Sequence, residues 1–187
     1  MKSKEIILKS LRRKKRGLKL SKPNNSLSQR HLNKADHNLI VMTDLNKLGH
    51  EDWVIITAYY AMYHSALSLL LKIGLESKDH ATTASILEYF FGEHINKELL
   101  DKFNDLKEKK DKIEAVTIKE KYINYLWDVK QARETVQYGV SINYKETTNV
   151  LSHARDFVSK IKLVNSELDE KILSVIQTKI NELKEEI

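Results

Sequence analysis

The sequence contains no cysteine, a single proline and only five glycines among 187 residues. The absence of cysteine excludes disulfides, thiolate zinc sites, redox pairs and a cysteine nucleophile. Because proline and glycine usually punctuate strands, their scarcity favours a mostly helical fold. With 41% apolar and 31% charged residues, the composition is typical of a globular domain. A chain of this length can bury a core that needs neither a metal nor a disulfide for stability.

Positive charge is concentrated at the start of the chain. The formal net charge is +6, but residues 1–22 hold ten lysines or arginines and one acid, Glu5, so this arm carries +9 and leaves −3 for the rest. A basic arm joined to an acidic body indicates contact with phosphate groups. The densest part contains no aromatic side chain, which predicts sequence-tolerant, salt-dependent binding of nucleic acid. The candidate nucleic-acid-binding residues are Arg12, Arg13, Lys14, Lys15 and Arg16.

The arm has two other interpretations. It could be a solvated tail that keeps the protein soluble. Alternatively, Ile6, Ile7, Leu8 and Leu11 could form the apolar face of a short helix that docks on the body or on an anionic membrane surface. No apolar stretch of the signal-peptide type follows the basic start, so we expect a cytoplasmic protein.

The rest of the chain divides into helices with visible boundaries. Residues 22–26 contain the only proline and read as a break. Helices bounded by glycine or capping residues are expected over 27–48, 51–73 and 83–91, with a fourth from Asn96. Capping boxes predict three later helices, which begin at Thr117, Asn143 and Ser166. The sequence thus predicts a basic arm (1–22), a helical bundle (23–165) and a C-terminal amphipathic helix (166–187), whose apolar stripe either closes the bundle or pairs with a second copy.

The segment 53–73 is apolar at 16 of its 21 positions and is long enough to span a bilayer. Its middle, however, is crowded with hydroxyl and imidazole groups, for which lipid offers no partners. We therefore expect a central helix wrapped by the others and no membrane span.

This segment also carries a recognisable pattern. Residues 58–66 read AYYAMYHSA, and Lys78-Asp79-His80 precedes the next expected helix. The combination of a tyrosine-pair helix and a Lys-x-His element resembles the HEPN family (higher eukaryotes and prokaryotes nucleotide-binding), in particular its small stand-alone prokaryotic members. The resemblance covers residues 27 to about 164. It implies an all-α antiparallel up-down helical bundle, commonly a homodimer, often encoded beside a minimal nucleotidyltransferase in a toxin-antitoxin pair.

Catalytic members of that family resemble one another in an arginine and a following histidine separated by four to six residues, and they cleave RNA without metal. Arg133 matches the arginine, but Tyr138 occupies the position of the histidine. Imidazole exchanges protons near neutral pH, whereas an unperturbed tyrosine has a pKa of about 10. The two positions also lie about 140° apart on a regular helix. The resemblance therefore implies a role without catalysis.

Each candidate residue has two interpretations. Arg133 is either a phosphate contact or half of a structural ion pair with a carboxylate of the first body helix. Tyr138 either covers the core at a helix end or carries a hydroxyl that a partner nucleotidyltransferase modifies. His64 is either a hydrogen-bonded core histidine or the missing catalytic base. His80 is expected to cap its helix with Asp79, with the lining of a cleft as the alternative.

The seven histidines show no spacing that would place metal ligands on one helical face, and no glycine-rich phosphate loop is present. We expect neither a metal nor a cofactor. The prediction is a protein that works with RNA or with a nucleotidyltransferase partner and does not cleave RNA. One alternative is an active ribonuclease toxin in which Arg133 stabilises phosphorane charge while His64 or Tyr138 moves the proton. The other is a pure protein-interaction module.

Overall fold

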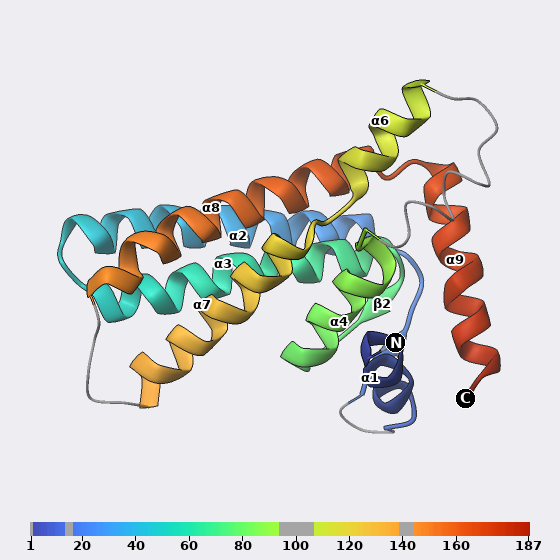
Figure 1. Cartoon of the computed structure of the whole chain (residues 1–187), viewed down its shortest axis with the longest axis horizontal. Coiled ribbons are helices and arrows are strands. Elements are labelled where there is room, and N and C mark those ends of the chain that lie inside the picture. Colours follow the sequence, from blue (N-terminus) through green and yellow to red (C-terminus); the bar gives the residue numbers. More distant parts are fainter. Residues whose placement is uncertain (1, 14–16, 94–106, 139–143) are drawn as a thin grey trace.

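The computed structural model describes residues 2–13, 17–93, 107–138 and 144–187. These residues are predominantly helical, which confirms the predicted all-α class (Figure 1). The helices are α1 (Lys2–Leu11), α2 (Asn25–Lys47), α3 (Glu51–Lys72), α4 (His80–Phe91), α6 (Lys107–Val116), α7 (Glu120–Tyr138), α8 (Tyr144–Glu167) and α9 (Glu170–Glu185). The strands β1 (Lys19–Leu20) and β2 (Leu75–Glu76) form one short antiparallel pair.

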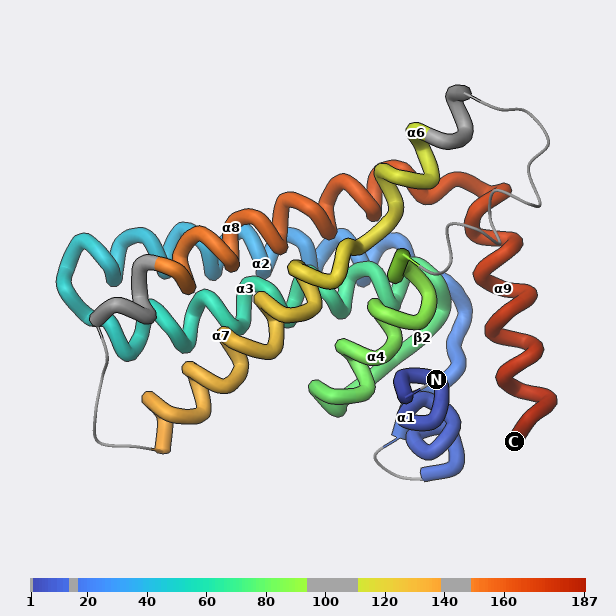
Figure 2. Tube along the Cα trace, in the orientation of Figure 1, coloured from blue at the N-terminus to red at the C-terminus, as the bar shows by residue number. Residues whose placement is uncertain are grey.

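Helix α3 is the centre of the fold. It packs against α2, α4, α7 and α8, and Figure 2 shows α2, α3 and α8 running alongside one another. Among the described residues, α3 is the one helix with the length and apolar composition to cross a bilayer, and most of it is buried by its neighbours. The predicted central helix is therefore confirmed, and no membrane span is indicated.

A buried polar cluster joins three of these helices. The Ser28 hydroxyl of α2 donates to the Ser68 carbonyl of α3 over 2.7 Å, and the Asn165 amide of α8 reaches the hydroxyls of both serines at 3.3 Å. The ammonium group of Lys72 donates to the Asn165 carbonyl. Since buried polar groups are costly unless paired, these bonds fix the register of α2 and α8 on α3.

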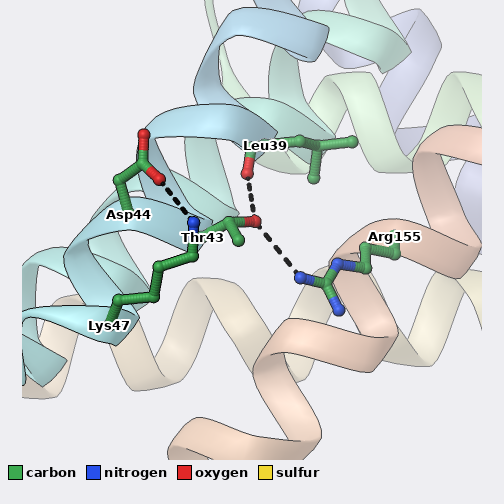
Figure 3. A network of polar contacts seen from close by, with 5 residues as sticks. All are labelled: Leu39, Thr43, Asp44, Lys47 and Arg155. Carbon is green, nitrogen blue, oxygen red and sulfur yellow. Dashed lines mark hydrogen bonds and ion pairs between the residues drawn. The ribbon is translucent and has the colours of Figure 1, made fainter.

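A second polar network joins α2 to α8 near the surface (Figure 3). The Arg155 guanidinium on α8 donates to the Thr43 hydroxyl over 3.1 Å, and that hydroxyl donates to the Leu39 carbonyl over 2.8 Å. Within α2, Lys47 forms an ion pair with Asp44 at 3.0 Å. Arg155 is thus engaged by a neutral hydroxyl at the α2–α8 contact.

The amino-terminal segment is folded onto the body over its described residues. Helix α1 lies beside α4 (Figure 1), with Ile7 fully buried, and β1 pairs with β2 in the register Lys19–Glu76 and Leu20–Leu75. An ion pair of 2.7 Å joins Lys4 to Glu186 near the two chain ends. The described residues of the arm thus form a short helix docked on the body, as one of the interpretations expected, and they are not a solvated tail.

Three helix starts differ from those predicted. Helix α4 begins at His80 rather than at 83, because the Asp79 carboxylate accepts from the Thr82 amide over 2.8 Å and caps the helix. Ser166 lies inside α8, and Asp169 caps α9 instead. Helix α7 begins at Glu120, while the Thr117 hydroxyl donates to the Ile113 carbonyl of α6. The caps predicted at Asn96 and Asn143 lie outside the described residues.

Helix α9 stands across the end of the bundle where α3 finishes (Figure 2). The Gln177 side chain donates to the Ile73 carbonyl over 2.7 Å. The apolar stripe of α9 is buried in the same core as α3 and α4. The stripe therefore closes the bundle within one chain, which is one of the two roles that the sequence left open for it.

Candidate functional site

Three helices bring aromatic and basic side chains together at one place. The Arg133 guanidinium of α7 lies over two rings of α3, with its carbon 5.4 Å from the ring centroid of Tyr59 and 5.8 Å from that of Tyr60. The His80 ring, at the start of α4, lies 4.4 Å from the ring of Tyr63 and hydrogen-bonds the Tyr59 hydroxyl. We call these five residues the Arg133 cluster.

The local sequence explains this arrangement. Tyr59 and Tyr63 are four residues apart and share one face of α3, and Tyr60 lies beside them. Tyr59 is buried, whereas Tyr60 is 37% exposed, so the cluster extends from the core to the surface. The Asp79 cap fixes His80 as the first residue of α4, next to the tyrosine face. The packing of α4 and α7 on α3 then places Arg133 over the same rings.

Arg133 lacks the partner that a structural arginine has. Among the described residues, no carboxylate forms an ion pair with it, and its buried Nε has no hydrogen-bond acceptor. The adjacent Glu134 pairs with Lys130 at 2.7 Å. The predicted ion pair with a carboxylate of the first body helix is therefore absent from the described part of the chain. A half-buried cation without a counterion costs desolvation free energy, which an incoming anion would offset.

His80 and Tyr59 form a neutral pair. Burial lowers the pKa of His80, and the positive charges of Arg133 and Lys130 lower it further, against smaller effects of nearby carboxylates. Burial raises the pKa of Tyr59, so the phenol keeps its proton. When that phenol donates to Nδ1 of His80, the imidazole proton resides on Nε2. The cluster then presents a guanidinium and an imidazole N–H donor, which suit the oxygens of a phosphate.

The family of the chain follows from a comparison with known families. The family model described as HEPN domain matches residues 28–164. The chain belongs to the HEPN family. The matched range contains the whole Arg133 cluster and excludes α1, β1 and α9. No curated protein matches the chain. Membership in this family supports a helical protein associated with nucleotides or RNA.

His64 of α3 is hydrogen-bonded to a histidine of α2. Nδ1 of His64 lies 2.9 Å from Nδ1 of His31 on α2. Burial lowers the pKa of His64 to about 4, with further lowering by His31 and Lys34. His64 is thus a hydrogen-bonded histidine between two helices, which is one of its two interpretations. Its ring centroid also lies 6.4 Å from that of Tyr63, while its Nδ1 is engaged by His31.

Tyr138 lies at the end of α7 and is 78% exposed, so it does not cover the core. Helix α7 continues to this residue, and positions five apart on a helix point in different directions. Arg133 and Tyr138 therefore do not converge within one chain. The exposed hydroxyl remains accessible to a modifying enzyme.

His80 was expected to cap α4 together with Asp79, with the lining of a cleft as its alternative role. The cap at Asp79 is confirmed, whereas the imidazole of His80 hydrogen-bonds the Tyr59 hydroxyl. The signal lay in two elements of the HEPN pattern, the tyrosine pair and the Lys-x-His element. The sequence did not reveal that these elements meet each other and Arg133.

The basic segment is described only in part. Arg12 and Arg13 are exposed, and Arg12 donates to the Glu186 carbonyl over 3.2 Å. Lys14, Lys15 and Arg16 lie outside the described residues. Within the described ranges, no group of three or more histidine, aspartate or glutamate side chains could hold a metal ion.

Proposed function

We propose that this HEPN protein binds RNA or a nucleotide through a phosphate group at the Arg133 cluster and leaves it uncleaved. The observation that carries the proposal is the half-buried Arg133 guanidinium, which has no carboxylate partner in the described part of the chain. In this role the protein is a cytoplasmic homodimer and the bundle partner of a minimal nucleotidyltransferase, an arrangement that the family resemblance implies.

Phosphate recognition accounts for each member of the cluster. Arginine offers a planar fork of donors that matches two phosphate oxygens. The Nε2–H of His80 supplies a further donor, oriented by Tyr59 at the other ring nitrogen. The partly exposed Tyr60 ring lies under the guanidinium and offers a surface on which a base can stack. The cluster therefore recognises a phosphate together with an adjacent base.

We expect no cleavage because the cluster lacks a complete set of groups for proton transfer. Attack by a 2′-hydroxyl needs one group that accepts its proton and another that protonates the leaving oxygen. Among the described residues, the only imidazole in the cluster is that of His80, and its Nδ1 is engaged by Tyr59. His64 faces α2, and Tyr138 is exposed beyond the cluster. The cluster thus binds the anion without a complete acid–base pair.

One observation favours a second function, a metal-independent ribonuclease. An imidazole from another helix does lie beside Arg133, although it is His80 and neither of the two groups, His64 and Tyr138, proposed from the sequence to move the proton. In the alternative tautomer, Nδ1–H donates to the Tyr59 oxygen, and the lone pair of Nε2 accepts the proton of the 2′-hydroxyl as its oxygen attacks phosphorus. The imidazolium then returns this proton to the 5′-oxygen as its bond to phosphorus breaks. Arg133 then stabilises the charge of the phosphorane. The two functions share their residues and differ in whether RNA stays intact.

Binding of a fluorescent single-stranded RNA and of AMP tests the proposal, with Arg133→Ala as the variant and Arg155→Ala as the matched control. Arg155 sits at the α2–α8 contact (Figure 3). Because charge-assisted hydrogen bonds contribute about 1.5–3 kcal/mol, Arg133→Ala should weaken both ligands about tenfold or more. Arg155→Ala should bind as the wild type does. Equal affinities for all three proteins would refute the phosphate site.

The integrity of the RNA separates the two functions. We expect an unlabelled RNA to remain intact on a gel after overnight incubation with the protein in EDTA. Cleavage that disappears in His80→Ala would establish the ribonuclease and overturn the noncatalytic role.

Co-purification with a nucleotidyltransferase encoded next to the chain tests the partner, and a chain that always purifies alone contradicts that part of the proposal.

A further inference from the structure

The end of α1 is attached to the start of α4. The buried Ser10 hydroxyl accepts from the Leu18 amide over 3.0 Å and lies 3.2 Å from the Thr82 hydroxyl, within hydrogen-bond distance. Thr82 in turn donates its amide and its hydroxyl to the Asp79 carboxylate, at 2.8 and 2.5 Å. His80 follows Asp79 directly. The chain that leaves α1 therefore lies at the corner of the fold where His80 of the Arg133 cluster is placed.

The two described arginines of the basic segment are held at this corner. The Arg13 amide donates to the Ser10 carbonyl over 3.1 Å. Gly17 lies so close to the end of α1 that a Cβ there would be 2.0 Å from the Ser10 carbonyl oxygen and 2.5 Å from that of Arg13. Only glycine fits such an approach. Arg12 and Arg13 are thus positioned by the backbone, while both side chains are exposed.

Electrostatics agree with this placement. Burial works to raise the pKa of Asp79, but hydrogen bonds from Thr82, followed by electrostatic interactions with His80 and Arg13, lower it overall. Its carboxylate is engaged by Thr82 as the helix cap. The other nearby acid, Glu134, pairs with Lys130. Arg13, His80 and Arg133 therefore lie around the start of α4, where the two neighbouring carboxylates are already engaged.

We propose that the amino-terminal segment extends the Arg133 cluster into a continuous track for single-stranded RNA, in which Arg13 and Arg133 contact different phosphates of one strand. This inference rests on the proposed function and names its ligand class as a polynucleotide rather than a mononucleotide. A single strand is required because the exposed ring of Tyr60 can stack only on a base that is free of a duplex. The track joins α1, outside the family range, to the HEPN domain.

The test compares a 12-nucleotide single-stranded RNA with AMP, using the full chain and the variant Arg13→Gln. Arg30→Gln on α2 is the matched control, because it removes the same charge from another exposed arginine. Arg13→Gln should weaken the RNA about three- to tenfold at low salt and leave AMP unchanged. Since each phosphate contact to a single strand contributes about 0.7 to the slope of log K against log salt, the slope should fall by about that amount. Arg30→Gln should leave both affinities and the slope unchanged.

Different results refute the two proposals. If Arg133→Ala weakens AMP but Arg13→Gln and Arg30→Gln change RNA affinity equally, the phosphate site stands and the track is wrong. If AMP binding does not depend on Arg133, the proposed function fails first. A 12-nucleotide duplex that binds as tightly as the single strand, with the same loss in Arg13→Gln, would also overturn the single-stranded track.

Discussion

Nδ1 of His31 on α2 lies 2.9 Å from Nδ1 of His64 on α3, and the two ring centroids are 5.1 Å apart. A hydrogen bond between these nitrogens needs one donor and one acceptor, so at least one ring must stay neutral. Burial lowers the pKa of both histidines, and neighbouring positive charges, Arg30 for His31 and Lys34 for His64, lower them further. The hydrogen bond between the two rings is therefore present above the pH at which both rings would be protonated.

This pair predicts that the folded state loses stability in mild acid. The pKa of His64 falls from 6.5 in the unfolded chain to about 4 in the fold, so between these values the unfolded chain binds more protons. The contribution of His64 to the stability of the folded state is therefore fully present above pH 6.5 and declines as the pH falls towards 4. Urea unfolding from pH 7.5 to 4.5 should show the decline, and His64→Gln should reduce its slope. His37→Gln, which removes a histidine from α2 outside this contact, is the control. An unchanged slope in His64→Gln would contradict the assignment of this pH dependence to His64.

The bond between Tyr59 and His80 predicts a functional effect without loss of the fold. Tyr59→Phe keeps the ring beneath Arg133 and removes the hydroxyl that orients His80. We expect a cost of about 1 kcal/mol in the free energy of unfolding and a several-fold weaker affinity for single-stranded RNA. Nitrogen NMR of His80 should show a change in the tautomer. Tyr63→Phe, in which the ring that contacts His80 at a tilted angle is kept, is the control and should leave the tautomer unchanged.

Two glycines provide a matched test of how the amino-terminal segment is docked. Gly74 and Gly49 have φ angles of +80° and +77°, so alanine at either position costs about 1–2 kcal/mol of backbone strain. At Gly74, however, a Cβ would also lie 2.7 Å from the Ser21 carbonyl oxygen, whereas at Gly49 no described atom lies within 4 Å. Gly74→Ala should therefore destabilise the protein more than Gly49→Ala does in urea unfolding. Equal losses would show that residue 21 is not held against this turn.

Several elements were predictable because their signals are local. The helices expected over 27–48 and 51–73 begin and end within two residues of α2 and α3, since apolar periodicity and the glycines at 49 and 74 act within a few residues. The start at Ser166 was wrong because two adjacent motifs compete there. Ser166 continues α8, and Asp169 is the residue whose side chain accepts from the Ile172 amide.

By itself the sequence determined the all-α class, the central helix 51–72 and the absence of a histidine shortly after Arg133, because composition and periodicity constrain each segment independently. Only the tertiary structure decided that His80 meets Arg133, that His64 meets His31 and that α1 lies against α4. These contacts join residues far apart in the chain. They depend on the rotation of each helix in the shared core, where burial and hydrogen bonding of all the helices together select one arrangement.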